Sequence, residues 1–235
     1  AITPQLGFSG SGFFNYNVAD FKSLLDEYGL KAKSAHIHWH TLNTRMPEVG
    51  DAARSLGLEC VGIAFIPEEK RKTLDGYKRM ADEFNVLGDL AKKEGLKFIY
   101  HNHGYGLKEQ DDQVPMKLIL DNTDPELVFF EMDIFWTTAG GANPIEYLKS
   151  YPNRYLCIHL KDMSKLVYFS KDGSNPQQWI ELLPYMTNVG NGILDIKQIV
   201  YEAKKNGVQH FFVEQDMVEN PKIALQASLD FLKNI

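Results

Sequence analysis

The chain has 235 residues, of which 44% are hydrophobic and 24% are charged, and its formal net charge is −6. This composition predicts a globular protein with a sizeable core in a single domain, 1–235, because no shift in composition marks a boundary. The acidic balance, without a dense Lys/Arg cluster, excludes nucleic acid held through its phosphates. No apolar run reaches the roughly 18 residues that span a membrane, so membrane insertion is excluded.

Short hydrophobic runs alternate with segments of helical spacing along the whole chain. The runs predict strands at 6–8, 32–38, 60–65, 97–101, 127–133, 155–161 and 209–214. Helices are predicted at 18–28, 47–56, 74–94 and 116–120, and again from Asn143, Asp195 and Asn220. This alternation, without hairpin turns, predicts a parallel sheet. The sequence contains neither a P-loop nor a GxGxxG motif, which counts against a nucleotide-binding Rossmann fold.

Four of the predicted strands, 97–101, 127–133, 155–161 and 209–214, end in or next to side chains that can ligate a metal. Polar residues at the carboxyl ends of parallel strands are typical of a (β/α)₈ barrel. Neighbouring strands lie about 4.8 Å apart, so ligands on several strand ends can meet at one ion. The irregular stretch after 163 is too long for a simple connection and predicts a lid over this end of the sheet.

Six short motifs occur in order along the chain. They are HNH (101–103), EMDIFW (131–136), GGANP (140–144), IHLKD (158–162), VGNGILD (189–195) and VEQD (213–216). In this order and spacing the chain resembles the sugar phosphate isomerase/epimerase group of the xylose isomerase-like TIM barrels. The resemblance implies a TIM (β/α)₈ barrel in which strand 6–8 is the second strand. The first βα unit would then be missing upstream of Ala1, which accounts for the count of seven strands.

The resemblance also implies a metal centre. Epimerases of this group hold a divalent ion with Glu, Asp, His and Glu on four strand ends, and Asp133, His159 and Glu214 match the last three. The first position falls on His101, where those epimerases have a glutamate. The resulting two nitrogen and two oxygen ligands suit Mn²⁺, Zn²⁺, Co²⁺ or Fe²⁺ better than Mg²⁺ or Ca²⁺. The alternative is a metal-free polar mouth in which these side chains pair with one another.

Three residues are predicted to be catalytic. Glu214 is assigned as the base, because it is the one that remains of the two glutamates that serve as bases in those epimerases. Lys161 lies two residues past His159 and faces the same way. It is expected to stabilise an enolate oxygen, or to act as an acid or base after nearby charge lowers its pKa; alternatively, it only balances the acidic mouth. His103 is expected to carry a proton near neutral pH.

Four further residues, His36, His38, Asn102 and Trp136, are predicted to contact the substrate. The histidines lie at the end of a predicted strand, and their alternative role is hydrogen bonding at the rim. Trp136 can stack on a sugar ring, and its alternative role is ordinary packing.

Glu131 is left outside the predicted ligand set. It lies two residues before Asp133 and faces the same side of its strand. It either orients a metal-bound histidine, ligates the ion itself, or forms a buried ion pair, for example with Lys161.

The sequence therefore predicts a metal-dependent sugar isomerase or epimerase, which removes a proton next to the carbonyl of a small sugar or sugar derivative. The missing first glutamate supports an alternative, a lyase or dehydratase of keto-sugars or 3-keto-glycosides. A non-catalytic sugar-binding barrel is the alternative from another class.

Cys60 and Cys157 lie inside apolar runs, which indicates buried reduced thiols rather than a disulfide. No signal-peptide pattern is present. We expect a cytoplasmic protein, or a periplasmic one if a leader was removed before Ala1, and the sequence leaves a homo-oligomer open.

Overall fold

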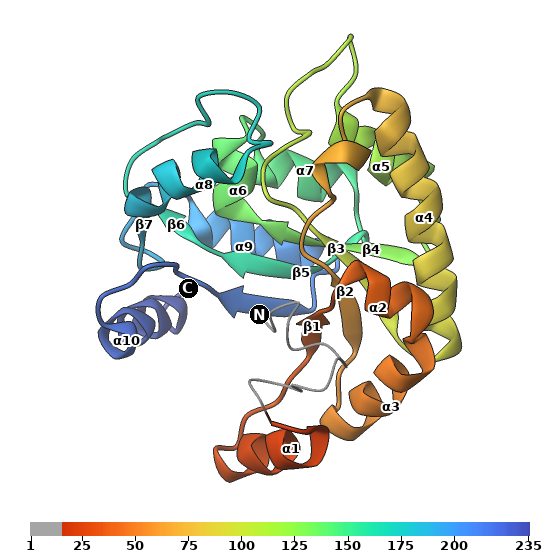
Figure 1. Cartoon of the computed structure of the whole chain (residues 1–235). Helices are drawn as coiled ribbons and strands as arrows, with labels where there is room; N and C mark the ends of the chain where they lie inside the picture. Colours follow the sequence, from red (N-terminus) through yellow and green to blue (C-terminus); the bar gives the residue numbers. More distant parts are fainter. Residues whose placement is uncertain (1–15) are drawn as a thin grey trace.

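A curled parallel sheet lies at the centre of the computed structural model, which describes residues 16–235 (Figure 1). The strand order is β1-β2-β3-β4-β5-β8, and every neighbouring pair is parallel. The strands are β1 (Ser34–His36), β2 (Cys60–Ile63), β3 (Lys97–His101), β4 (Val128–Asp133), β5 (Tyr155–Leu160) and β8 (His210–Val213). Six of the seven predicted strands are thus confirmed, and the one at 6–8 lies outside the described residues.

The helices on the outer face of the sheet follow from apolar spacing and from polar caps. Those predicted from the sequence are α1 (Val18–Glu27), α3 (Met46–Leu56), α4 (Leu74–Lys93), α5 (Pro115–Asn122), α7 (Pro144–Ser150), α9 (Ile196–Lys205) and α10 (Pro221–Leu232). Asn143, Asp195 and Asn220 each accept a hydrogen bond from a backbone amide of the first helical turn, as N-caps do. Phe84 of α4 is fully buried between the helix and the sheet, where it packs on Tyr100 of β3.

The prediction that strand and helix alternate without hairpins is wrong between 162 and 187. There, β6 (Asp162–Met163) and β7 (Met186–Thr187) form an antiparallel pair, with α8 (Pro176–Leu182) and the short 3₁₀ helix η3 (Leu183–Tyr185) between them. Asn175 caps α8 and Pro176 begins it, a start signal that the surrounding polar sequence hides.

Three further short elements were not predicted. These are α2 (Trp39–Thr44), α6 (Ile134–Ala139) and the 3₁₀ helix η2 (Glu68–Lys70).

The segment 163–187 packs over the carboxyl ends of β4 and β5, beside α6 (Figure 1). Phe169, Leu182 and Met186 are buried in a small cluster with Phe135 and Trp136 of α6. Because this cluster is separate from the main core, the segment has its own hydrophobic anchor.

A small hydrophobic cluster, apart from the main core, lies along β2, β3, β5 and β8. Cys60, Ile99 and Cys157 are buried there with Phe212 against them. Both cysteines are free, as predicted. Among residues 16–235, no helix combines the length and the apolar character that crossing a membrane requires.

Candidate active site

The strand register brings the predicted site residues to one face of the sheet, at two depths. His101 of β3 is paired with Glu131 of β4, whereas Asp133 of β4 is paired with His159 of β5. Residues paired in register point to the same face, and residues two apart along a strand do so as well. His101 and Glu131 therefore lie one step deeper than Asp133 and His159.

The deeper group surrounds the carboxylate of Glu131, which is fully buried. One of its oxygens, Oε2, contacts Nε2 of His36 and lies 3.5 Å from Nδ1 of His101. The other, Oε1, lies 3.2 Å from Nε2 of His159. Three imidazoles from three strands, β1, β3 and β5, thus face one carboxylate on β4. The sequence placed Glu131 on the correct face but did not indicate this central position.

The outer group consists of Asp133, His159 and Glu214, whose ligand atoms lie within 4.8 Å of one another. Nδ1 of His159 contacts Oε2 of Glu214 and is 4.0 Å from Oδ2 of Asp133. The structure therefore brings these three predicted ligands together. His101 belongs to the deeper group, so a single ion shared by His101 with Asp133 and Glu214 stays a prediction.

Lys161 lies between the carboxylates at the outer end of the site. Its Nζ is 3.2 Å from Oδ2 of Asp133, 3.2 Å from Oε1 of Glu214 and 3.1 Å from Oδ2 of Asp216. Burial alone would lower the pKa of Lys161, but Asp133, Glu214 and Asp216 outweigh it and raise the pKa above its ordinary value. The expected lowering of the Lys161 pKa is therefore wrong, because the nearby charges are negative. The side chain is an ammonium ion at neutral pH.

His159 carries the proton of the metal-free site. Burial opposes its charge, but the carboxylates of Glu131 and Glu214 on either side raise its pKa to about 10. Burial likewise opposes ionisation of Glu131 and Glu214, yet the neighbouring cations hold the pKa of both carboxyls below the usual range. Burial raises the pKa of Asp133, against the opposing charge of Lys161.

The first helical turn after β4 positions Asp133. Its Oδ1 accepts a hydrogen bond from the backbone N–H of Trp136, 3.0 Å away, as the N-cap of α6. This leaves Oδ2 directed at His159 and Lys161. Asn102, predicted to contact the substrate, accepts from the Asp133 N–H at 3.2 Å and donates to Oγ1 of Thr137 at 3.1 Å. Both ends of the buried Asn102 amide are thus engaged in positioning this strand end.

His103 lies at the rim, in a stack of aromatic rings. Its Nδ1 donates to the carbonyl of Ala64, 2.6 Å away, and its ring stacks on Trp179 of α8 with centroids 4.9 Å apart. Burial, helped by the charge of Lys161, lowers the His103 pKa to about 3. The expected titration near neutral pH is therefore wrong, and the ring is neutral with Nε2 free to accept. No sequence signal had pointed to Trp179.

The two remaining predicted substrate contacts differ in exposure. His38 is exposed, and its side chain caps α2 by accepting from the His40 N–H, so the chain has left β1 by this point. Trp136 is buried, its ring stacks on Phe169, and Nζ of Lys161 lies 5.6 Å from the ring centroid.

Two cavities adjoin the clusters. One, of about 200 Å³, lies between the edge strands and is lined by Ser34, His36, His159, Phe212, Val213 and Glu214. The other, of about 280 Å³, lies beyond the ends of β1 and β2 and is mainly apolar. His36 borders both cavities. Glu214 lines only the first of these two cavities.

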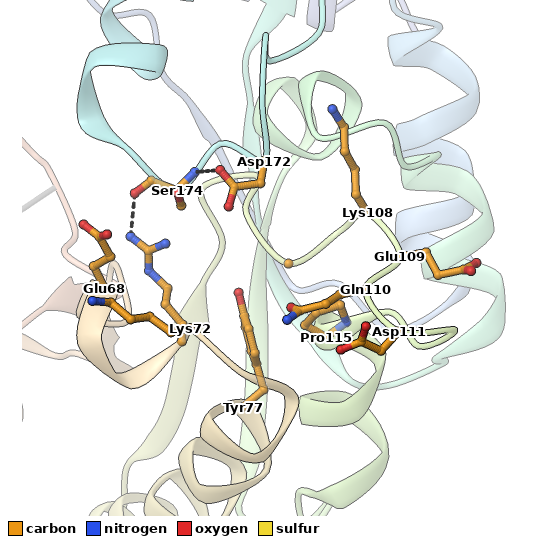
Figure 2. Close-up of a pocket in the computed structure, with 12 residues that line it drawn as sticks. Glu68, Lys72, Tyr77, Lys108, Glu109, Gln110, Asp111, Pro115, Asp172 and Ser174 are labelled. Carbon is orange, nitrogen blue, oxygen red and sulfur yellow. Dashed lines mark hydrogen bonds between the residues drawn. The ribbon is translucent and has the colours of Figure 1, made fainter.

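A third cavity, of about 590 Å³, lies outside these clusters and is shown in Figure 2. Lys72 and Lys108 line it together with Glu68, Glu109 and Asp172, so its charge is mixed. Arg71, also on its wall, stacks over Tyr105 and donates to the carbonyls of Ile66 and Ser174. Because the Arg71 guanidinium is engaged and the acidic side chains are close to the lysines, this cavity does not resemble an anion site.

The two groups fit a metal ion on the chemistry of their donors. Four buried atoms of these two groups have no hydrogen-bond partner among the described residues: Nδ1 of His101, Oε1 of Glu131, Oδ2 of Asp133 and Nδ1 of His159. Unsatisfied buried groups of this kind are rare in folded proteins, and an ion is one of the causes that explains them.

Comparison with known proteins identifies the fold family. The family model described as "Xylose isomerase-like TIM barrel" matches residues 4–235. The chain belongs to this family. The predicted fold class and the resemblance are thereby confirmed, and the six curled strands are part of such a barrel.

Curated relatives include an inosose dehydratase from Clostridium perfringens, 35% identical over 151 residues. The match covers 62% of this chain and 50% of the relative, so the chain spans about half the length of that protein. Among solved structures, a sugar phosphate isomerase/epimerase from Parabacteroides distasonis superposes with a TM-score of 0.76 at 22% identity, covering 97% of this chain and 85% of the other. The structure of the IOLI protein with a bound zinc atom gives a TM-score of 0.66 at 16% identity, covering 94% and 82%.

Proposed function

We propose that the protein is a metal-assisted dehydratase of a polyhydroxy ketone, removing a proton next to the carbonyl and releasing the adjacent hydroxyl as water. The observation that carries the proposal is the single carboxylate base. Glu214 lines the cavity between the edge strands, and its side chain is 30% exposed. By the resemblance described above, His101 stands at the position of the first glutamate of the epimerases. Elimination needs one such base, whereas epimerisation needs proton exchange on both faces of the carbon.

The chain's own residues supply the proton transfers. Glu214 is ionised at neutral pH and takes the proton from the carbon next to the carbonyl. The ammonium of Lys161, held between Asp133, Glu214 and Asp216, donates to the oxygen on which negative charge develops. The neutral Glu214 then returns the proton to the departing hydroxyl. One C–H and one C–O bond break, a C=C bond forms and water leaves.

The ion belongs to the outer group in this proposal. Asp133, His159 and Glu214 would hold it, and when bound it would polarise the ketone as a Lewis acid. Neutral His103 accepts a hydrogen bond from a substrate hydroxyl through Nε2, because its Nδ1 proton is committed to Ala64. The match with the inosose dehydratase supports this reaction class, and the zinc in the IOLI structure supports the ion.

The test is an incubation of the Mn²⁺- and Zn²⁺-loaded protein with an inosose and with 3-keto-glucosides. The expected product is 18 Da lighter than the substrate and carries a conjugated carbonyl that absorbs in the near ultraviolet. Glu214→Gln should lower this rate by at least 100-fold, a typical contribution of a general base. Glu109→Gln makes the same substitution at an exposed carboxylate of the third cavity, away from both clusters, and is the matched control.

An epimerase is the second candidate, supported by the names of the structural neighbours. It predicts a product of unchanged mass that takes up deuterium from D₂O. That outcome would replace the dehydratase, and no turnover of any ketose or keto-glycoside would favour the sugar-binding barrel.

A further inference from the structure

We propose that His36, His101, Glu131 and His159 form a buried divalent-metal site of Zn²⁺ type, in addition to the outer group. Three imidazoles and one carboxylate on four strands direct one atom each toward a common point, all within 4.8 Å of one another. The exposed fraction of each of these residues is 8% or less. The inference goes beyond the proposed reaction and does not depend on it, because three of the four residues, His36, His101 and Glu131, belong neither to the outer group nor to the proposed proton transfers.

The spacing of the donor atoms matches a tetrahedral ion. With ligand bonds of about 2.0–2.1 Å, the edges of a tetrahedron measure roughly 3.4 Å. Two donor separations in this group are close to that length, one to each oxygen of the Glu131 carboxylate: Oε2 lies 3.5 Å from His101 Nδ1, and Oε1 lies 3.2 Å from His159 Nε2. Nε2 of His36 makes a shorter contact with Glu131 and would move outward slightly on loading.

Hydrogen bonding alone leaves the group incompletely satisfied. Nδ1 of His101 and Oε1 of Glu131 are both buried and both lack a hydrogen-bond partner among the described residues. The contact between Glu131 and His36 accounts for only one of the three histidines. An ion at the common point would give every one of these atoms a partner. Four protein ligands without an open position are the arrangement of a structural zinc site.

His159 connects this site to the outer group. Its Nε2 faces Glu131, whereas its Nδ1 faces Asp133 and Glu214. An ion bound through Nε2 would fix the ring at the orientation in which Nδ1 meets the outer carboxylates. Loading the deeper site therefore organises the outer one. The structure thus assigns His36, expected to contact sugar, to the metal.

The test is metal titration of the full chain after chelation and dialysis. Co²⁺ is followed by its visible absorption, which is intense only for tetrahedral sites, and bound Zn²⁺ is counted by elemental analysis. The wild type should bind one tetrahedral Co²⁺ at the deeper site. His36→Gln should weaken that ion by at least about tenfold, since even changes behind the ligands cost 10–100-fold. Glu131→Gln should weaken Co²⁺ binding to a similar extent. If this fully buried variant does not fold, His36→Gln alone carries the test.

Two controls separate the sites. His38→Gln makes the same substitution at the exposed histidine two residues away and should leave the tetrahedral band unchanged. Asp133→Asn alters only the outer group and should also retain the tetrahedral Co²⁺ band. The proposal is overturned if His36→Gln binds Co²⁺ with the wild-type spectrum and affinity, or if Asp133→Asn removes the tetrahedral band. A protein without dehydratase activity that keeps the His36-dependent ion would overturn the proposed function alone.

Discussion

Oε1 of the fully buried Glu131 lies 3.2 Å from Nε2 of His159, and the opposite nitrogen of the same ring contacts Glu214. A carboxylate behind a metal-ligating histidine normally fixes its tautomer and orientation. Here two carboxylates compete for one ring, so in the metal-free protein His159 is held as an imidazolium. Proton and metal ion must therefore compete for this ring.

The first prediction concerns the stability of the metal-free protein at high pH. The pKa of His159 is about 10 in the folded chain and about 6.5 in an unfolded one. A raised pKa stabilises the folded state fully below pH 6.5, and this contribution is lost as the pH rises through 10. We expect the free energy of urea unfolding in EDTA to fall across this window, by at most about 1.4 kcal/mol per pH unit.

His159→Gln is the comparison for this experiment. The difference in unfolding free energy between the two proteins should shrink steadily from pH 7 to pH 10. A difference that stays constant over this range would show that His159 is not protonated in the folded chain.

The second prediction concerns Asp162, which follows Lys161 but points away from the site. Its carboxylate accepts hydrogen bonds from four backbone amides, three of them in the VGNGILD motif: Met163, Gly190, Gly192 and Leu194. Asp162→Ala should lower the free energy of unfolding by on the order of 3 kcal/mol, because the amides lose a charged acceptor. Asp216→Ala removes a partly exposed carboxylate and should cost clearly less, and equal losses would contradict this assignment.

Asp162 also shows what the sequence revealed and what it did not. The motifs IHLKD and VGNGILD indicated the family. Asp162 and the glycines of VGNGILD, however, anchor a loop and take no part in the proposed reaction. Gly192 must lack a side chain because a Cβ there would lie 2.3 Å from Oδ1 of Asp162. Strands β1 to β5 and β8 were predictable because buried parallel strands are continuous apolar runs.

The depth of each site residue was not predictable from strand alternation. Alternation gives the face of a residue, but depth depends on the stagger between strands. A shift in register between Phe130 and Glu131 adds to that stagger. In the separate pairing of β3 with β4, His101 lies level with Glu131 instead of Asp133. Trp179 was missed because it sits in a segment whose helix is short and whose neighbours are polar.

The third prediction concerns Asn102, which the structure places behind Asp133. Asn102→Ala should lower the free energy of unfolding by about 1–3 kcal/mol, because Thr137 and the Asp133 amide lose their partner in a buried place. Metal affinity of the outer group should fall as well, since Asp133 loses its support. Thr137→Val removes only the hydrogen bond from the Asn102 amide to Thr137, so it should lower the free energy of unfolding by less. If Asn102→Ala instead raised the KM and left stability and metal affinity unchanged, the earlier prediction that Asn102 contacts the substrate would be supported.

The fourth prediction separates the charge of Lys161 from its place in the fold. Lys161→Met keeps the length and apolar stem of the side chain but removes the ammonium that Asp133, Glu214 and Asp216 share. Activity should fall by roughly 100-fold or more, as for the loss of one donor to a developing oxyanion. Divalent-metal affinity of the outer group should rise, on the order of tenfold even if the charges interact as weakly as in water.

The opposite signs of these two effects make the experiment decisive. A lysine that only holds the carboxylates in place would, on removal, weaken metal binding and activity together. A lysine that competes with the ion for the same oxygens while serving the reaction gives tighter binding and slower turnover. Calorimetric titration with Mn²⁺ and initial rates on the same preparations measure both, and Lys165→Met, an exposed lysine four residues along, should leave both values at the wild-type level.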